Sequence, residues 1–140
     1  MPAKMTPAEL MDFLDREFPQ TSDMGLRVEQ AGDGTARVRL PVSERNLRPG
    51  GTVSGPTLFW LADLTFYVAV LAEIGPVALA VTTNMSINFL RKPGLTDLIA
   101  EFRMLKLGRR LAVGDIAIYS EGNAEPVAHV TGTYSIPPER

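Results

Sequence analysis

The spacing of apolar residues changes several times along this chain, and each change predicts a different element. Near the N-terminus, Thr6-Pro7-Ala8-Glu9 has the pattern of a capping box with proline at the first helical position. Four apolar residues then follow at helical spacing, Leu10, Phe13, Leu14 and Phe18. The sequence therefore predicts a short amphipathic helix that ends before Pro19.

From Gly25 the apolar spacing becomes two, which is the period of a half-buried strand. Leu26-Arg27-Val28 and Ala36 to Leu40 alternate in this way around a turn signal, Gly32-Asp33-Gly34, and predict a hairpin with one solvent-facing side. After residue 75 the chain contains four more strand-like runs separated by short polar breaks. They cover about Ala78 to Leu90, Leu95 to Leu107, Leu111 to Ser120, and Pro126 to Ile136.

Between the hairpin and these runs lie a polar loop, Ser43 to Ser54, and a long apolar helix that starts near Gly55, runs to about Ile74 and closes at Gly75-Pro76. This helix is apolar around nearly its whole circumference, so it must be covered on all sides. Six strands can supply that cover as one curved antiparallel sheet wrapped around the helix, an α+β architecture. The open edges of such a sheet predict pairing with a second copy, as a homodimer or a dimer of dimers.

One acidic residue, Asp63, stands inside this apolar helix. An ionised carboxylate left unpaired in apolar surroundings costs several kcal/mol or more. Asp63 must therefore be paired, hydrated or functional, and it is the leading candidate for chemistry.

Composition narrows the possible functions. The 140 residues predict a single domain, 1–140, and a formal charge of −2 does not point to nucleic acid or an anionic membrane. The absence of cysteine excludes disulfides, thiolate metal sites and a cysteine nucleophile, and makes a reducing cytoplasm the simplest location. The N-terminus has no signal-peptide pattern, and the apolar stretch around Asp63 is expected to be too short for a membrane span. No metal-ligand set or phosphate-binding loop is recognisable.

In this order of elements, the chain resembles the hotdog fold, and specifically acyl-CoA thioesterases of the phenylacetate-degradation, or PaaI-like, type. The resemblance runs from about Leu26 to Tyr134. In that family a loop Asn precedes a His-Gly-Gly turn, an acid follows nine residues after the His, and a Ser or Thr lies on the next strand. The matching positions here are Asn46, Ser54-Gly55-Pro56, Asp63 and Thr82.

The resemblance implies hydrolysis of acyl-CoA thioesters at a dimer interface. The Gly55 N–H, at a helix N-terminus, would stabilise the developing oxyanion, and Asp63 would be general base or nucleophile. Asn46 and Thr82 would orient the carbonyl or the attacking water. Eight residues of helix separate Gly55 from Asp63 by about 12 Å. The resemblance implies that the helix start of one subunit faces the acid of the other, as in the related enzymes, which would resolve this separation.

Three departures from the family pattern keep other interpretations open. Ser54 replaces the histidine and Pro56 the second glycine, and the preceding loop is two residues longer. Ser54 is most simply a helix N-cap, and Asp63 can be a structural acid that accepts hydrogen bonds from hydroxyls such as Thr82. The only histidine, His129, lies in the last strand run, and a satisfied or exposed strand residue is its simpler interpretation.

The resemblance also suggests how the substrate binds, with coenzyme A as part of the substrate and no separate cofactor. Two basic doublets, Arg91-Lys92 and Arg109-Arg110, are candidates for its phosphates, although turns attract charge for solubility as well. The acyl chain would lie along aromatic residues of the central helix, Phe59, Trp60, Phe66 and Tyr67. Two alternatives remain: a hydratase or dehydratase, which commonly needs a histidine near this helix, and a catalytically silent acyl-CoA or aromatic-ligand binder.

Overall fold

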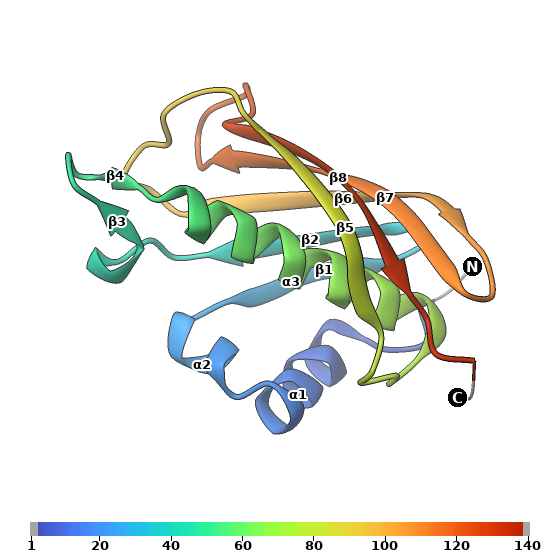
Figure 1. Ribbon diagram of the computed structural model, residues 1–140. Helices are drawn as coiled ribbons and strands as arrows, with labels where there is room; N and C mark the ends of the chain where they lie inside the picture. The colour runs from blue at the N-terminus through green and yellow to red at the C-terminus, as the bar shows by residue number, and fades with distance from the viewer. Residues whose placement is uncertain (1–2, 139–140) are drawn as a thin grey trace.

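A single long helix lies across the concave face of a curved antiparallel sheet (Figure 1). The computed structural model describes residues 3–138. The helix, α3, spans Gly55–Ile74, and the six strands pair in the order β1-β2-β6-β7-β8-β5. Their bounds are β1 Arg27–Gly32, β2 Thr35–Leu40, β5 Val81–Phe89, β6 Leu98–Leu107, β7 Leu111–Ser120 and β8 Ala128–Ser135. The predicted α+β hotdog arrangement is confirmed.

Local sequence explains where these elements begin and end. Ser54 caps α3 by accepting a hydrogen bond from the Thr57 N–H, and Gly75, at φ 97°, ends the helix in a conformation that favours glycine. The N-terminal helix α1, Pro7–Glu17, has the predicted capping box between Thr6 and Glu9. It packs against β1 and α3, so the N-terminal part of the chain covers a side of α3 that the sheet leaves open (Figure 1).

Three features of the fold depart from the sequence-based expectation. A further short helix, α2, spans Gln20–Met24, and the polar loop contains a 3-10 turn, Glu44–Asn46, followed by a two-stranded ribbon of β3, Leu47–Arg48, and β4, Thr52–Val53. By length and composition, α3 would suffice to cross a membrane, so the expectation that this stretch is too short is wrong. Most of its surface is nevertheless enclosed within the protein, as is usual for the core helix of a globular domain.

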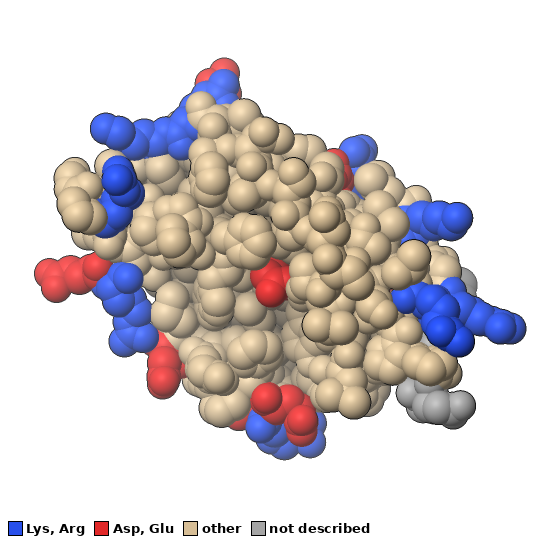
Figure 2. All heavy atoms as spheres, viewed as in Figure 1, with Lys and Arg blue, Asp and Glu red and all other residues tan. Residues whose placement is uncertain are grey.

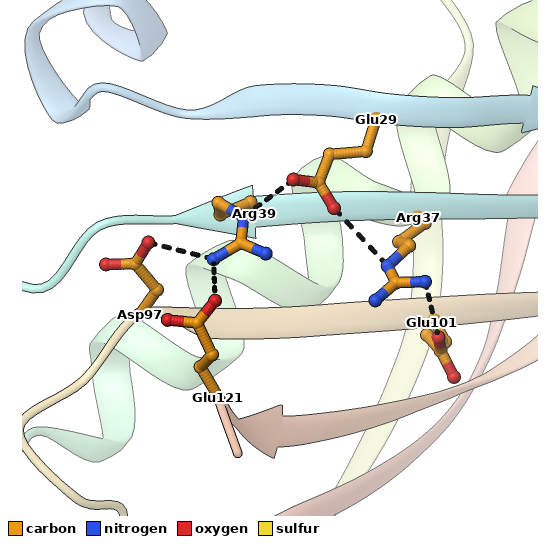
Figure 3. A network of polar contacts seen from close by, with 6 residues as sticks. All are labelled: Glu29, Arg37, Arg39, Asp97, Glu101 and Glu121. Carbon is orange, nitrogen blue, oxygen red and sulfur yellow. Dashed lines mark hydrogen bonds and ion pairs between the residues drawn. The ribbon is translucent and has the colours of Figure 1, made fainter.

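The outer face of the sheet carries a network of ion pairs (Figure 3). Arg39 on β2 contacts Glu29, Asp97 and Glu121 at 2.6, 2.9 and 2.7 Å. Hydrogen bonds to these three carboxylates, with Glu29 the strongest contributor, raise the pKa of Arg39. The network joins β1 and β2 to the two ends of the β6–β7 segment, and it lies on the side away from α3 because alternate residues of β2 face the core.

Under α3 the sheet contains a glycine that lets two aromatic rings pack closely. A Cβ at Gly114 would lie 2.5 Å from Cζ of Phe102 and 2.9 Å from the backbone oxygen of Arg103. The Phe102 ring in turn packs edge-on against Phe66 of α3, with centroids 4.9 Å apart. Gly114 is thus required by the close approach of the helix to the sheet.

We expect Gly114→Ala to lower the free energy of unfolding by about 1–3 kcal/mol, because the methyl group overpacks a site where backbone is one of the neighbours. Chemical denaturation provides the measurement. Gly108→Ala is the matched control, since its Cβ would meet its nearest neighbour at an ordinary 3.5 Å. Equal stability of the two variants would contradict this account of the packing.

Candidate functional site

Asp63 projects from the middle of α3 and is held by two hydroxyl groups. Its Oδ1 accepts hydrogen bonds from Thr82 Oγ1 at 2.5 Å and from the Tyr134 hydroxyl at 2.7 Å. Tyr134 also lies 3.0 Å from the Asp63 backbone oxygen. No partner of Oδ2 is found among residues 3–138. One carboxylate oxygen is therefore saturated while the other remains available.

The structure brings Thr82 to Asp63, as the sequence predicted, and adds Tyr134, which sequence reasoning missed. Tyr134 is only 3% exposed, and its ring stacks on Phe66 with centroids 4.6 Å apart. Burial, together with the Asp63 carboxylate, raises the pKa of Tyr134, so its hydroxyl stays a donor. The position of Tyr134 depends on strand register. Thr82 on β5 pairs directly with Tyr134 on β8, and this pairing cannot be predicted from the sequence alone.

The start of α3 offers one free backbone donor. Thr57 N–H is bonded to Ser54 Oγ at 3.2 Å, Leu58 N–H to the Ser54 carbonyl at 3.3 Å, and Pro56 has no N–H. Of the first-turn amides, only that of Gly55 has no acceptor within the described part of the chain. An N–H in this position carries the positive end of the helix dipole and suits a negatively charged oxygen.

Gly55 and Asp63 line the same groove, which has a volume of about 650 Å³. Its walls come from one stripe of α3 and from the adjacent end of β5. The other lining residues are Pro56, Phe59, Trp60, Ile87 and Phe89. The two groups are two turns apart on one helix, about 12 Å, which is too far for both to reach one substrate atom.

A second hollow of about 330 Å³ lies on the other side of Asp63. It is bounded by the end of α1, the middle of α3 and the segment that leads into β5. Asp63, Thr82 and Tyr134 all border it. The acid thus stands between two hollows, one leading toward the helix start and one toward the N-terminal helix.

Asn46 lies beside the start of α3 but lines neither hollow. Its backbone oxygen accepts from the Ser54 N–H at 2.7 Å, and its side-chain Oδ1 accepts from the Ser43 N–H at 2.8 Å. The side chain is buried, and its Nδ2 has no hydrogen-bond partner among the described residues. An unpaired buried amide costs about 1–3 kcal/mol, which makes it a candidate donor to a missing group.

The other predicted residues divide between groove, core and surface. Phe59 and Trp60 line the groove, whereas Phe66 is fully buried in the core and Tyr67 borders the second hollow. The first basic doublet, Arg91-Lys92, follows Phe89 at the Gly55 end of the groove. Arg91 forms an ion pair with Glu125 at 2.9 Å. Arg109-Arg110 is exposed in the β6–β7 turn and lines neither hollow.

The charge distribution of this face agrees with a site for a mostly apolar group. Figure 2 shows the side that carries α3 and β5, with Lys and Arg only around the rim. A single acidic side chain is visible near the centre, beside a hollowed surface. A charged ligand segment would therefore bind at the rim, and an apolar one across the middle.

His129 is far from this arrangement. It lies on β8 and its Nε2 is 3.1 Å from Asp115 Oδ2, an acid that Arg103 also binds at 3.1 Å. The prediction of a satisfied or exposed strand histidine is confirmed, and within residues 3–138 no serine is hydrogen-bonded to His129. Burial would raise the pKa of Asp115, but hydrogen bonds from Arg103 and His129 outweigh it, so the pKa of Asp115 lies below its ordinary value.

With fold and site described, the family can be stated. A model of the thioesterase superfamily matches residues 50–127, more than half of the chain, and the chain belongs to this family. The matched segment includes Ser54, Gly55, Asp63 and Thr82, but neither Asn46 nor Tyr134. Family membership supports hydrolase activity on thioesters in general.

Solved structures agree with this assignment. A Silicibacter protein provisionally named a thioesterase is 50% identical, with a TM-score of 0.90 over 99% of this chain and 96% of that one. PaaI, a phenylacetic acid degradation protein of Thermus thermophilus, is 31% identical, with a TM-score of 0.75 over 85% and 99%. A hypothetical thioesterase of Streptococcus pneumoniae, solved with coenzyme A, is 26% identical, with a TM-score of 0.77 over 94% and 98%.

The lowered pKa of Asp115 predicts a pH-dependent contribution to stability. Because its folded pKa lies below the unfolded value of about 3.9, the contribution is complete above that value and is lost as the pH falls through the folded pKa. We expect Asp115→Asn to be less stable than wild type at pH 6 and the gap to narrow below about pH 4. Urea denaturation across pH tests this, and a constant gap would contradict it.

Proposed function

We propose that this protein is an acyl-CoA thioesterase whose site forms between two copies of the chain, with Asp63 from one and the Gly55 amide from the other. The proposal rests above all on Asp63: a carboxylate with one oxygen held by Thr82 and Tyr134 and the other without a partner, between two hollows. The reducing cytoplasm is the proposed location, consistent with a chain without cysteine.

The reaction needs a base or nucleophile and an oxyanion donor. Asp63 takes a proton from water as the water oxygen attacks the thioester carbon, or attacks that carbon itself. Negative charge then develops on the carbonyl oxygen, where a helix N-terminal N–H stabilises it. The carbon–sulfur bond breaks, and the thiolate of coenzyme A leaves and is protonated. When water is the nucleophile, the acyl group is released directly as a carboxylic acid. When Asp63 attacks, the acyl group stays on its carboxylate as a mixed anhydride until water hydrolyses it to the acid.

Holding Oδ1 with two hydroxyls suits this role. The hydrogen bonds orient the carboxylate and leave Oδ2 as the oxygen that faces a reactant. Thr82 is thus a positioning residue, and Tyr134 is a second one. Asn46 belongs in the proposal through its unpaired buried amide, which is available to a water or to a group brought by the second copy.

Two observations support a homodimer or a dimer of dimers. Strand β5 is the last strand of the sheet, and its edge region carries exposed apolar residues, Val81 at 56%, Phe89 at 56% and Leu90 at 49%. An exposed apolar edge strand is a template for pairing with another chain. Two-fold pairing at this edge would also turn the groove of one copy toward that of the other, which resolves the 12 Å separation of Gly55 and Asp63.

Coenzyme A fits the groove better than a small ester would. Phe59, Trp60 and Phe89 offer an apolar path, and Lys92 follows at the end where Phe89 packs over Gly55. Lys92, and Arg109-Arg110 reached through the second copy, are the proposed phosphate contacts. A silent acyl-CoA binder remains the second candidate, because Ser54, which stands at the family's histidine position, is engaged as a helix cap.

Asp63→Asn is expected to reduce kcat/KM for acyl-CoA hydrolysis by about 10²–10⁴-fold, because the proton acceptor is lost. Release of free thiol from an acyl-CoA panel is the readout. Glu73→Gln is the matched control on the same helix: Glu73 accepts a hydrogen bond from the Gly34 N–H at 2.9 Å, and glutamine can keep it. Saturable binding of acyl-CoA without thiol release by wild type would instead establish the binder.

A mixing experiment tests the shared site. Asp63→Asn and Gly55→Val should each be nearly inactive as pure proteins, the latter because a Cβ at Gly55 would already contact the Phe89 ring at 3.4 Å and the two methyl groups of valine are expected to obstruct the Gly55 N–H. After co-refolding in equal amounts, half of the dimers pair the two variants and hold one intact site of two, so about a quarter of wild-type activity should return. Sedimentation checks that both variants remain dimers. No recovery in mixed dimers would place both groups in one subunit.

A further inference from the structure

The second hollow, beyond Asp63, has part of its wall outside the matched family segment. Its lining includes Glu17 and Phe18, at the end of α1 and just after it, opposite Leu64 and Tyr67 of α3. Residues 50–127 carry the family match, so Glu17 and Phe18 lie outside it. A property determined by these two residues does not follow from the family match.

Resting on the proposed thioesterase function, we infer that this hollow receives the acyl group and that Phe18 and Glu17 select short, uncharged apolar acyl chains. The two substituents of a thioester carbonyl point in different directions from the carbon that reacts. With that carbon at Asp63, the coenzyme A arm runs along the open groove toward Lys92 and the rim. The acyl group then enters the hollow on the other side of the acid.

The dimensions of the hollow limit the chain length. Its volume of about 330 Å³ is at the lower end of the range for ligand pockets, about 300–1,000 Å³. Phe18 closes it from the N-terminal side, with its ring edge-on to Tyr67 at 6.2 Å between centroids. Tyr67 is fixed in turn by a hydrogen bond from its hydroxyl to the Ala78 carbonyl at 2.9 Å. Phe18 therefore packs against an aromatic residue, Tyr67, whose position is fixed by this hydrogen bond.

Glu17 adds a charge to this boundary. Glu17 is an exposed residue on the same rim. Burial is the main cause that raises the pKa of Tyr67, and the Glu17 carboxylate is the second cause. Glu17 and Tyr67 both line the hollow, so the negative charge lies at its wall. An acyl chain that ends in a carboxylate would meet a like charge there, whereas a methyl end would not.

Phe18→Ala tests the length limit. Wild type is expected to prefer hexanoyl-CoA to dodecanoyl-CoA, and the variant should reduce that preference in kcat/KM by about 10-fold or more, as removal of a pocket wall admits several methylenes. Phe13→Leu is the matched control: Phe13 is on α1 and, like Phe18, near Tyr67, with centroids 6.5 Å apart, but does not line the hollow. An unchanged length profile in a folded Phe18→Ala protein would overturn the inference.

Glu17→Gln tests charge selection at an exposed position where folding is not at risk. Wild type should prefer hexanoyl-CoA to adipoyl-CoA, which has the same six-carbon chain ending in a carboxylate. Glu17→Gln should reduce that preference by about 5-fold, because it removes the repulsion between Glu17 and the carboxylate of the substrate. Glu17→Lys should reduce it by more, since charges near a protein surface interact over several ångströms. Equal ratios in all three proteins would overturn the role of Glu17.

These outcomes separate the inference from the function on which it rests. If wild type releases thiol from none of the acyl-CoAs, the thioesterase proposal itself fails. If wild type is active but neither Phe18→Ala nor Glu17→Gln changes the ratios, the thioesterase proposal stands and the acyl group lies elsewhere.

Discussion

The apolar circumference of α3 has to be covered on every side, and one stripe of the helix is left uncovered by the chain itself. Sheet strands and α1 enclose most of the helix, but Pro56, Phe59, Trp60 and Asp63 remain partly or well exposed along a single face. This stripe lies beside β5, one of the two edge strands of the sheet. In the proposed dimer, a second copy would cover this stripe, and Asp63 lies within it.

Local sequence sufficed for the elements and for half of the site. The capping box at Thr6, the glycine stop at Gly75 and the alternating strands are readable because each depends on neighbouring residues. Helix α2 and the β3–β4 ribbon were missed because such short pieces form only against the rest of the structure. Tyr134 was missed for a different reason: its contact with Asp63 depends on the register of β5 on β8, across 71 residues.

Substitution of the family's histidine by Ser54 changes the site in a definite way. The Ser54 hydroxyl is committed to the helix start, through the Thr57 N–H at 3.2 Å and the Thr57 hydroxyl at 2.8 Å. Its backbone is bonded to Asn46, so the cap, the preceding loop and the helix form one rigid junction. Pro56 adds no donor, so among the described residues the Gly55 N–H is the one amide of this junction that is available to a ligand. A substrate carbonyl at this position would then be polarised by the backbone.

The structural and catalytic interpretations of Asp63 are not exclusive, because its two oxygens have different environments. The hydroxyls of Thr82 and Tyr134 offset the cost of placing a carboxylate in an apolar helix, and both act on Oδ1. Burial keeps the tyrosine protonated, so this support persists over a wide pH range. Oδ2 then needs no structural partner. Asp63 is only partly buried, so Oδ2 is open to water or to a reactant, and the proposed chemistry at Asp63 rests on this difference between its two oxygens.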